Sequence, residues 1–229
     1  MKNLVVLSGA GISKESGLDT FRDADGMWKE YDPRELASTV ALANNPGRVM
    51  EFYNMRRKKM WGADPNAAHR CLAELEKKYN ITIITQNVDD LHERAGSKNI
   101  IHIHGELGKV RSSSNPDNII EVEKGREINL GDLASDGSQL RPHVVLFGEP
   151  VPKMAEAIEI TKKADIFIVV GTSLQVYPAA ELIDFTNSNC ETYIVDPEKP
   201  SVQEKSNRYF IVEKATSGLP KLVHKLLDE

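Results

Sequence analysis

The sequence predicts an α/β fold: a parallel sheet with helices on both faces, plus a smaller inserted lobe. Two observations support this class. Short apolar runs rich in β-branched residues recur along the 229 residues, and helical patterns separate several of them. Residues 23–66 and 106–142 break this alternation, and we assign both to the smaller lobe. Residues 1–22, 67–105 and 143–229 then form the large lobe of one domain that spans the whole chain.

Six runs are expected to form strands. They are LVVL (4–7), ITIIT (81–85), NIIHIH (99–104), HVVLF (143–147), DIFIVVGTS (165–173) and ETYIVD (191–196). Helical patterns are expected at 67–79, 152–164 and 178–188, and in the smaller lobe at 47–61. Parallel sheets bind ligands outside the carboxyl ends of their strands, so we expect a crevice there, beneath the smaller lobe.

The composition is that of an ordinary globular protein, with 40% hydrophobic and 28% charged residues. A net charge of −5 argues against a broad nucleic-acid-binding surface. We interpret the one basic run, residues 56–59, as a solvated helix face. No apolar run approaches the roughly 20 residues that span a bilayer. We therefore expect neither nucleic acid nor membrane as a partner.

The cysteines favour a reducing, cytoplasmic location. Cys71 and Cys190 form no CxxC pair and offer no disulfide framework. Cys71 lies on the apolar side of a helical pattern, which predicts a buried, inert thiol. The first strand begins almost at Met1, so we expect no signal or transit peptide.

The first strand runs into the turn Ser8-Gly9-Ala10-Gly11, which is typical of a phosphate-binding loop. The usual dinucleotide fingerprint nevertheless fails. It requires a third glycine where Lys14 stands, and an acidic residue that ends a second strand about 20 residues later. Asp32 lies near that distance but not in a strand. The glycine pair could therefore be a purely structural turn.

Three further strand ends carry polar groups. They are TQNVDDLHERAG (85–96), IHIHGEL (101–107) and GTSLQVYPAAEL (171–182). Helix capping alone would explain Asn87, Asp89, Thr172 and Ser173. Four such turns, all at strand ends, are harder to explain by capping than any one of them.

Two histidines near residue 100 suggest either a metal site or a general base. His102 and His104 would share one face of a strand and could bind a metal together with His92 or His143. No carboxylate follows at a metal-binding spacing, and His102 could be a core histidine. His104, at the strand end, is the better candidate for a general base.

Five motifs together resemble those of the sirtuins, a family of NAD-dependent protein-lysine deacylases. In chain order they are GAGISKESGLDTFR (9–22), TQNVDDLH (85–92), HIHGEL (102–107), RPHVVLFGE (141–149) and GTSLQVYPAAEL (171–182). The resemblance spans nearly the whole chain and implies a Rossmann-like sheet. It also implies that NAD is consumed as a co-substrate, which explains why the usual fingerprint is incomplete.

The resemblance implies roles for the motif residues. Those implied to bind the diphosphate, ribose and nicotinamide of NAD are Gly9, Ala10, Gly11, Phe21, Arg22, Gln86, Asn87 and Asp89. Those implied at the adenosine half are Gly171, Thr172, Ser173, Asp196 and Ala215. Two positions depart from the family pattern: Asp196 replaces an Asn, and Asp19 replaces a Pro on the loop that closes over NAD. The implied catalytic residues are His104, Asn87 and Asp89.

The implied reaction releases nicotinamide and transfers an acyl group from lysine to ADP-ribose. His104 would deprotonate a ribose hydroxyl during that transfer. Val145, Phe147 and Gly148 would pair with the backbone of the substrate peptide, as an added strand. We expect acyl-lysine proteins as substrates and a monomeric enzyme.

Most sirtuins carry two CxxC pairs that hold a structural zinc, and this chain departs from that pattern. Residues 106–142 contain no cysteine, and serines stand where the first pair would be. A tetrahedral zinc site needs four N or S ligands, and His143 is the nearest spare one. We expect no zinc, and a smaller lobe held by packing alone.

The acyl preference depends on residues 52–60. Tyr53 and Arg56 are three apart and would share a helix face, where a phenol and a guanidinium could bind a carboxylate. An ordinary surface Arg beside a half-buried Tyr is the alternative that spacing alone favours. The sirtuin branch that removes malonyl and succinyl groups carries this Tyr-x-x-Arg, and Ala24 resembles the small residue of its roomy acyl pocket.

Three functions therefore remain open. The first is a deacylase that prefers acidic acyl groups (a desuccinylase or demalonylase) and accepts acetyl-lysine as a secondary substrate. The second is a plain deacetylase or a mono-ADP-ribosyltransferase. The third is a non-catalytic sensor of NAD or ADP-ribose, against which the intact Asn87, Asp89 and His104 argue.

Overall fold

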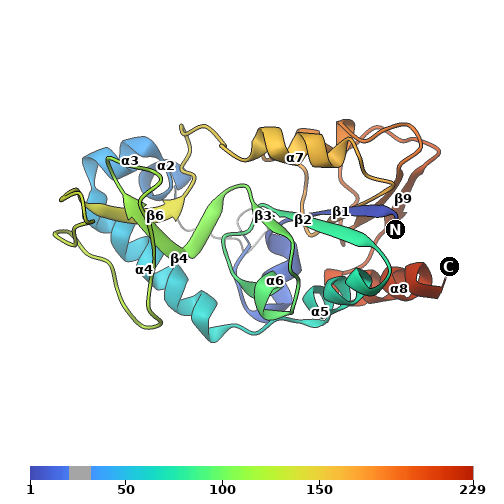
Figure 1. Cartoon of the computed structure of the whole chain (residues 1–229), viewed down its shortest axis with the longest axis horizontal. Coiled ribbons are helices and arrows are strands. Elements are labelled where there is room, and N and C mark those ends of the chain that lie inside the picture. Colours follow the sequence, from blue (N-terminus) through green and yellow to red (C-terminus); the bar gives the residue numbers. More distant parts are fainter. Residues whose placement is uncertain (21–31, 229) are drawn as a thin grey trace.

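A six-stranded parallel sheet forms the frame of the protein (Figure 1), in a computed structural model that describes residues 1–20 and 32–228. The strand order is β3-β2-β1-β7-β8-β9. The strands are β1 Asn3–Ser8, β2 Asn80–Thr85, β3 Ile100–His102, β7 Ile166–Val170, β8 Glu191–Val195 and β9 Arg208–Ile211. The order reverses between β1 and β7, so the carboxyl ends of these strands form the point at which such sheets bind ligands.

Helices cover both faces of this sheet, as Figure 1 shows. One face packs on α5 (Ala67–Glu74) and α8 (Ala215–Asp228), and the other on α7 (Met154–Thr161) and η3 (Ala179–Asp184). Alternate residues of each strand serve the two faces. In β1, for example, Leu4 packs in the first cluster and Val5 in the second. The α/β class predicted from the sequence is confirmed.

A second, antiparallel sheet in the order β5-β4-β6 lies at the other end of the molecule (Figure 1). Its strands are β4 Gly105–Ser112, β5 Ile119–Glu121 and β6 Leu140–Val144. It packs with α2 (Pro33–Leu36), α3 (Thr39–Asn44) and α4 (Pro46–Gly62). The short elements η1 (Ala10–Ser16), η2 (Leu75–Lys77) and α6 (Leu91–Arg94) complete the described structure.

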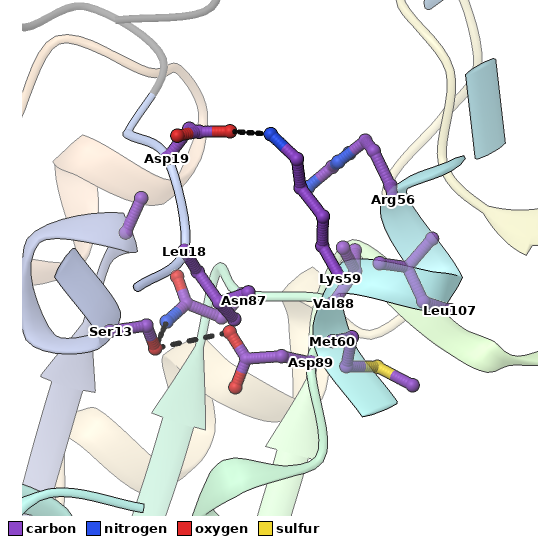
Figure 2. Close-up of a pocket in the computed structure, with 11 residues that line it drawn as sticks. Ser13, Leu18, Asp19, Arg56, Lys59, Met60, Asn87, Val88, Asp89 and Leu107 are labelled. Atoms are coloured by element: carbon purple, nitrogen blue, oxygen red, sulfur yellow. Dashed lines mark hydrogen bonds and ion pairs between the residues drawn. The ribbon is translucent and has the colours of Figure 1, made fainter. Parts of the chain in front are cut away.

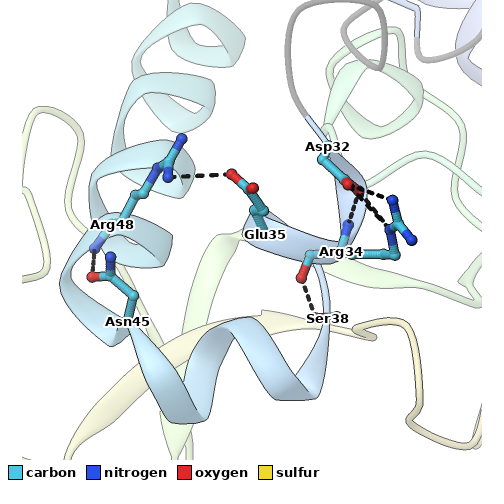
Figure 3. Close-up of polar contacts among 6 residues, drawn as sticks. All are labelled: Asp32, Arg34, Glu35, Ser38, Asn45 and Arg48. Carbon is cyan, nitrogen blue, oxygen red and sulfur yellow. Dashed lines mark hydrogen bonds and ion pairs between the residues drawn. The ribbon is translucent and has the colours of Figure 1, made fainter.

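Side-chain caps fix the start of each helix in this second region (Figure 3). Asp32 and Asn45 accept hydrogen bonds from the backbone N–H groups two and three residues later, at 2.8 and 3.3 Å. Ser38 caps α3 in the same way, accepting from the N–H of Ala41 at 3.0 Å. Such caps satisfy N–H groups that the helix itself cannot pair. They define where α4 begins, and α4 carries Arg56.

Hydrogen bonds tie the tip of the small sheet together. The Ser112 hydroxyl, 1% exposed, donates to the Asp136 carboxylate at 2.6 Å. It also accepts from the backbone N–H of Asn115 at 2.8 Å and lies 2.6 Å from the hydroxyl of Ser138. The expectation that packing alone holds this lobe is therefore wrong. Among the described residues, no three or more His, Cys, Asp or Glu side chains gather as a metal site would require.

The basic run at 56–59 is only partly a solvated face. Lys58 and Lys59 are exposed, but Arg57 is buried and Arg56 is half-buried. Arg57 donates from Nε to the carbonyl of Leu107 at 2.7 Å, because α4 packs on β4. Burial lowers the pKa of Arg57 to about 10. The sequence interpretation is correct for the lysines and wrong for the arginines.

The strand expected in the large lobe at 143–147 is instead β6, Leu140–Val144, in the small antiparallel sheet. The other departures are local: the strand expected at 99–104 ends at His102, and the helix expected at 178–188 is a 3-10 helix. Cys71 is a buried free thiol whose pKa burial raises to about 12, as an inert thiol requires. Within the part of the chain that the structure describes, no helix has the length and apolarity needed to cross a bilayer.

Candidate active site

The first and last motif turns, at Gly9–Gly11 and at Gly171, pack directly against each other where β1 and β7 end. Gly11 donates its N–H to the carbonyl of Gly171 at 2.9 Å. A Cβ at Gly9 would lie 2.7 Å from that carbonyl oxygen, and a Cβ at Gly11 would lie 2.8 Å from the Cα of Gly171. Gly171 itself has φ +63°, which favours glycine. These three glycines are thus required by contact between the turns, whatever ligand they also meet.

A pocket lies between the two sheets, beside these turns (Figure 2). The ends of β1 and β2 and the chain that follows them contribute one wall, and α4 and β4 contribute the other. The lining residues are Ala10, Ser13, Leu18, Asp19, Asn87, Val88 and Asp89 on the first side, and Arg56, Lys59, Met60 and Leu107 on the second. Polar groups therefore converge from both sides on a partly apolar cavity, the usual design of a small-molecule site.

Ser13 is the centre of a buried network that holds the polar side chains of this pocket. The Asn87 side-chain amide donates to the Ser13 hydroxyl at 3.1 Å, and that hydroxyl donates to the Asp89 carboxylate at 3.1 Å (Figure 2). His69 lies 3.4 Å from the same hydroxyl. Because Nδ1 of His69 accepts from the backbone N–H of Asn66, its proton is on Nε2, which donates to Ser13.

Burial sets the charges in this Ser13 network. It raises the pKa of Asp89 and lowers the pKa of His69 to about 4, so His69 is neutral at pH 7. Asp89 also accepts from the backbone N–H of Leu91 at 3.2 Å, so its capping role and its place in the pocket coexist. Asn87 and Asp89 are thus held in position by the protein alone.

His104 has the geometry of a general base. Its Nδ1 lies 3.1 Å from the carbonyl oxygen of Gln86, which can only accept, so Nδ1 carries the proton and Nε2 is the basic nitrogen. Burial lowers the pKa of His104, which favours the neutral form. His104 lies beyond the end of β3, so the expectation that it shares a strand face with His102 is wrong.

Arg56 lines the pocket, whereas Tyr53 does not. The guanidinium carbon of Arg56 lies 5.9 Å from the centroid of the Tyr53 ring. Tyr53 is 3% exposed and packs among apolar residues of the second region, and burial raises its pKa to about 12. The two residues are neighbours, as their spacing predicts, but only Arg56 faces the pocket.

Lys59 is a pocket residue that the sequence interpretation missed. Its ammonium group forms an ion pair with Asp19 at 2.6 Å, which links α4 to the chain after η1 (Figure 2). The available signal was its position three residues after Arg56, on the same helix face. Ser13 and His69 were also missed, because no local pattern shows that the ends of β1 and β2 and the start of α5 meet.

The remaining predicted NAD contacts are dispersed around the strand ends. The Gln86 side chain donates to the Thr172 hydroxyl at 3.1 Å, while Ser173 is exposed. Asp196 follows β8, and Ala215, 4% exposed, begins α8 within the hydrophobic core. The predictions for Phe21, Arg22 and Ala24 lie outside the described residues.

The predicted peptide-binding segment already pairs with another part of the chain at Phe147. Its N–H donates to the carbonyl of Ala37 at 2.8 Å, and its carbonyl accepts from the N–H of Thr39 at 3.0 Å. The Phe147 side chain is nevertheless 48% exposed. The Val145 N–H is also used within the chain, because it donates to the carbonyl of His104 at 2.9 Å, so a peptide strand added here could not use the N–H of either residue.

Comparison with known proteins identifies the architecture. A family model described as the Sir2 family matches residues 9–178. This chain belongs to the Sir2 family. It is 52% identical over 228 residues to an NAD-dependent protein deacylase of Helicobacter pylori, covering 100% of this chain and 99% of that one.

Solved structures of Sir2 proteins share the fold. A Sir2 homologue in complex with NAD has a TM-score of 0.89 and 41% identity, covering 99% of this chain and 90% of that one. A Sir2 protein in complex with a p53 peptide and NAD has a TM-score of 0.77 and 30% identity, covering 98% and 92%. The sirtuin resemblance and the Rossmann-like fold inferred from the motifs are confirmed.

Proposed function

We infer that this Sir2-family chain is an NAD-dependent protein-lysine deacylase. The observation that carries this conclusion is the pocket itself, in which the Ser13 network holds Asn87 and Asp89, together with a neutral His104 that bonds through Nδ1 to the carbonyl of Gln86, the residue before Asn87. NAD supplies the nicotinamide leaving group and the ribose that accepts the acyl group. The Helicobacter pylori relative is named an NAD-dependent protein deacylase, and the structure of a Sir2 homologue is a complex with NAD.

The side chains present fit the nicotinamide end of NAD. A carboxamide has two N–H donors and one carbonyl acceptor, and the pocket offers the Asp89 carboxylate and the Asn87 amide beside apolar Ala10, Leu18 and Val88. We propose that Asp89 orients the carboxamide and that Gln86 and Asn87 hold the ribose.

The other residues implied by the motifs take supporting roles in this proposal. Gly9, Ala10 and Gly11, with Phe21 and Arg22, bind the diphosphate side. Gly171, Thr172, Ser173, Asp196 and the backbone at Ala215 bind the adenosine side. Those of them that the structure describes cluster at the carboxyl ends of β1, β7 and β8 and at the start of α8, which supports this assignment.

His104 acts as the general base of the proposed reaction. Its Nε2 is free to take a proton from a ribose hydroxyl, because its other nitrogen donates to the Gln86 carbonyl. The substrate lysine would enter between the two lobes, with its peptide backbone beside Val145, Phe147 and Gly148. The lobes themselves are the two sheet regions. The boundaries drawn from the sequence need one correction, because the small antiparallel sheet includes Gly105 on β4 and residues 143 and 144 on β6.

We propose further that acidic acyl groups (succinyl and malonyl) are preferred. Arg56 lines the same pocket as Asn87 and Asp89, and burial beside Tyr53 lowers its pKa, as expected for a guanidinium held away from water. A carboxylate at the end of the acyl chain would pair with it at short range. Lys59, three residues later, adds a second positive charge to the wall.

A cytoplasmic, monomeric enzyme without zinc completes the proposal. Both cysteines are free, buried thiols, which is consistent with a reducing compartment. Light scattering after gel filtration tests the monomer, and cell fractionation tests the location.

The activity is tested with NAD and a panel of acyl-lysine peptides, by measuring nicotinamide and the mass of the acylated product. We expect nicotinamide and acyl-ADP-ribose in equal amounts, and only when an acyl peptide is present. Transfer of ADP-ribose to the peptide would instead identify a transferase, and no nicotinamide release would identify a sensor.

A further inference from the structure

His102 makes two hydrogen bonds that together define its protonation state. Its Nδ1 lies 3.1 Å from the carbonyl oxygen of Asn87, and its Nε2 lies 2.6 Å from the carboxylate of Glu93. Neither oxygen can donate: one is a carbonyl and the other belongs to an ionised side chain. A neutral imidazole has one bare nitrogen, which would then face an oxygen lone pair. Both contacts are satisfied only by the imidazolium.

The position of His102 connects this charge to the active site. His102 ends β3 and is 5% exposed. It binds the main chain of Asn87, whose side chain enters the Ser13 network and lines the pocket. The Asn87 N–H in turn donates to the Thr85 hydroxyl at 3.0 Å. The two contacts of His102, with the Asn87 carbonyl and the Glu93 carboxylate, form what we call the His102 bridge. This bridge anchors the main chain at Asn87 to α6.

We propose that His102 is a positioning residue for deacylation: its imidazolium ties Asn87 to Glu93, and loss of its second proton as the pH rises releases the main chain at Asn87 and lowers turnover. When that proton leaves, the remaining one stays on Nε2 beside the Glu93 carboxylate, so the bare Nδ1 faces the carbonyl oxygen of Asn87 and that contact is lost. The proposal rests on the deacylase function proposed above.

The charged and titratable groups around His102 act in both directions. Glu93 on α6 and Glu106 on β4 favour its imidazolium, and Asp89, before α6, also interacts with it. Asp90, Lys109 and Glu121 line the same cavity as His102, and of these Lys109 is a cation. Burial opposes the charge on His102, but the hydrogen bond and charge of Glu93 outweigh it, so its pKa is raised above 6.5. Burial lowers the pKa of His92, which therefore stays neutral.

A second cavity opens beside His102. It has a volume of about 330 Å³, is lined among others by Trp61, Val88, Asp89, Glu93 and His102, and shares Val88 and Asp89 with the first pocket. A water molecule needs roughly 10–15 Å³ of such space, so this cavity has room for water that can exchange protons with His102.

The two histidines of the HIH motif then shape one pH profile. The pKa of His104 is lowered by burial, and activity rises with pH as His104 becomes a free base. The pKa of His102 is raised, and activity falls as pH rises through it. Opposite shifts in neighbouring groups are the pattern by which acid and base roles separate. We therefore assign the rising limb of a bell-shaped pH profile to His104 and the falling limb to His102, and substitutions can test each assignment.

The test measures kcat against pH for the full chain with NAD and an acyl peptide, in three variants. Glu93→Gln keeps an acceptor for Nε2 but removes the charge, so the alkaline limb should move to lower pH by about one unit or more. His102→Gln keeps a donor for Asn87 but cannot titrate, so that limb should disappear. His224→Gln, on the exposed face of α8, is the matched control and should leave both limbs unchanged.

An NMR titration of the histidine rings provides a readout that does not depend on activity. The His102 signal, identified by its loss in His102→Gln, should show both nitrogens protonated at pH 7, and Glu93→Gln should lower its midpoint. A neutral His102 at pH 7, or coinciding pH profiles for wild type and Glu93→Gln, would overturn the proposal. An inactive wild type with a charged His102 would overturn the deacylase function and with it the link to turnover.

Discussion

The two walls of the pocket are built differently. On the large-lobe wall, Asn87 and Asp89 are 5% and 7% exposed and are fixed by the Ser13 network at the strand ends. On the small-lobe wall, Arg56 and Lys59 lie on one face of α4, half-buried and exposed respectively. Buried hydrogen bonds specify a single geometry, whereas a helix face can change its side chains without disturbing the strands.

This contrast suggests a division of labour. Reactive groups must be held within a fraction of an ångström, and the strand ends achieve this without any ligand. Selectivity requires only that a suitable charge reaches the acyl group, and α4 supplies it. Substitutions in the first wall should therefore reduce turnover on every acyl group, and those in the second should change the ratio between acyl groups.

The largest effect is expected for His104→Ala. Loss of a general base costs about 10²–10⁴ in rate, and this loss should be equal for acetyl and succinyl peptides. The affinity for NAD should stay within a few-fold, because the turns at Gly9 and Gly171 do not contact this side chain. Steady-state kinetics and NAD titration measure both quantities. More than half of wild-type activity in this variant would show that His104 is only structural.

Arg56→Met should separate the acyl classes. A hydrogen bond to a charged group contributes roughly 1.5–3 kcal/mol, which corresponds to about tenfold or more in rate. The value of kcat/KM should fall by that factor on succinyl- and malonyl-lysine and change little on acetyl-lysine. Arg48→Met is the matched control, since Arg48 lies on the same helix but pairs with Glu35 at 3.2 Å, outside the pocket.

Tyr53→Phe sharpens the same comparison. Because Tyr53 does not line the pocket, removing its hydroxyl while keeping the packed ring should leave the ratio between acetyl and succinyl peptides within about twofold of wild type. A selective loss on acidic acyl groups would mean that this hydroxyl reaches the acyl chain. Equal losses on acetyl and succinyl peptides in Arg56→Met would mean that α4 supports the fold or peptide docking instead.

The hydrogen bonds of Ser112 predict a stability effect that is confined to the small lobe. Ser112→Ala leaves two backbone N–H groups, at residues 114 and 115, without their acceptor. Such losses cost about 1–3 kcal/mol, and we expect a fall of that size in the free energy of unfolding. Denaturant titration measures it. Ser135→Ala, in the segment between β5 and β6 that also carries Asp136, changes an exposed serine and should be close to neutral. Equal effects of the two substitutions would contradict the role of Ser112.

The smallest effect is expected for metal removal. If Ser112 and its partners take the place of a zinc site, a chelator should change neither activity nor the unfolding midpoint, and elemental analysis should find no stoichiometric zinc. About one tightly held zinc per chain would contradict this expectation.

The sequence predicts the large lobe better than the small one, for a physical reason. Parallel strands covered on both faces are almost wholly apolar, so β1, β2, β7 and β8 are visible as runs. The strand β4, by contrast, alternates buried and partly exposed residues around two glycines, and β5 is exposed throughout. Neither has a clear local signal.

The candidate site, like the small lobe, could be predicted only in part from the sequence. Motif residues such as Asn87 and Asp89 could be found because each belongs to one short segment. The Ser13 network and the His102 bridge could not, because they join strand ends and helices far apart in the chain. The spacing of Tyr53 and Arg56 predicted a shared neighbourhood, but packing against β4 and β6 decides which of them faces the pocket.

The most direct test of this division between the walls is the selectivity of the unmodified enzyme. We would measure kcat/KM on acetyl-, malonyl- and succinyl-lysine peptides of one sequence, at saturating NAD. The charge on α4 predicts that an acidic acyl group is favoured over acetyl by about tenfold or more. Equal values, or a preference for acetyl-lysine, would contradict the assignment of selectivity to α4.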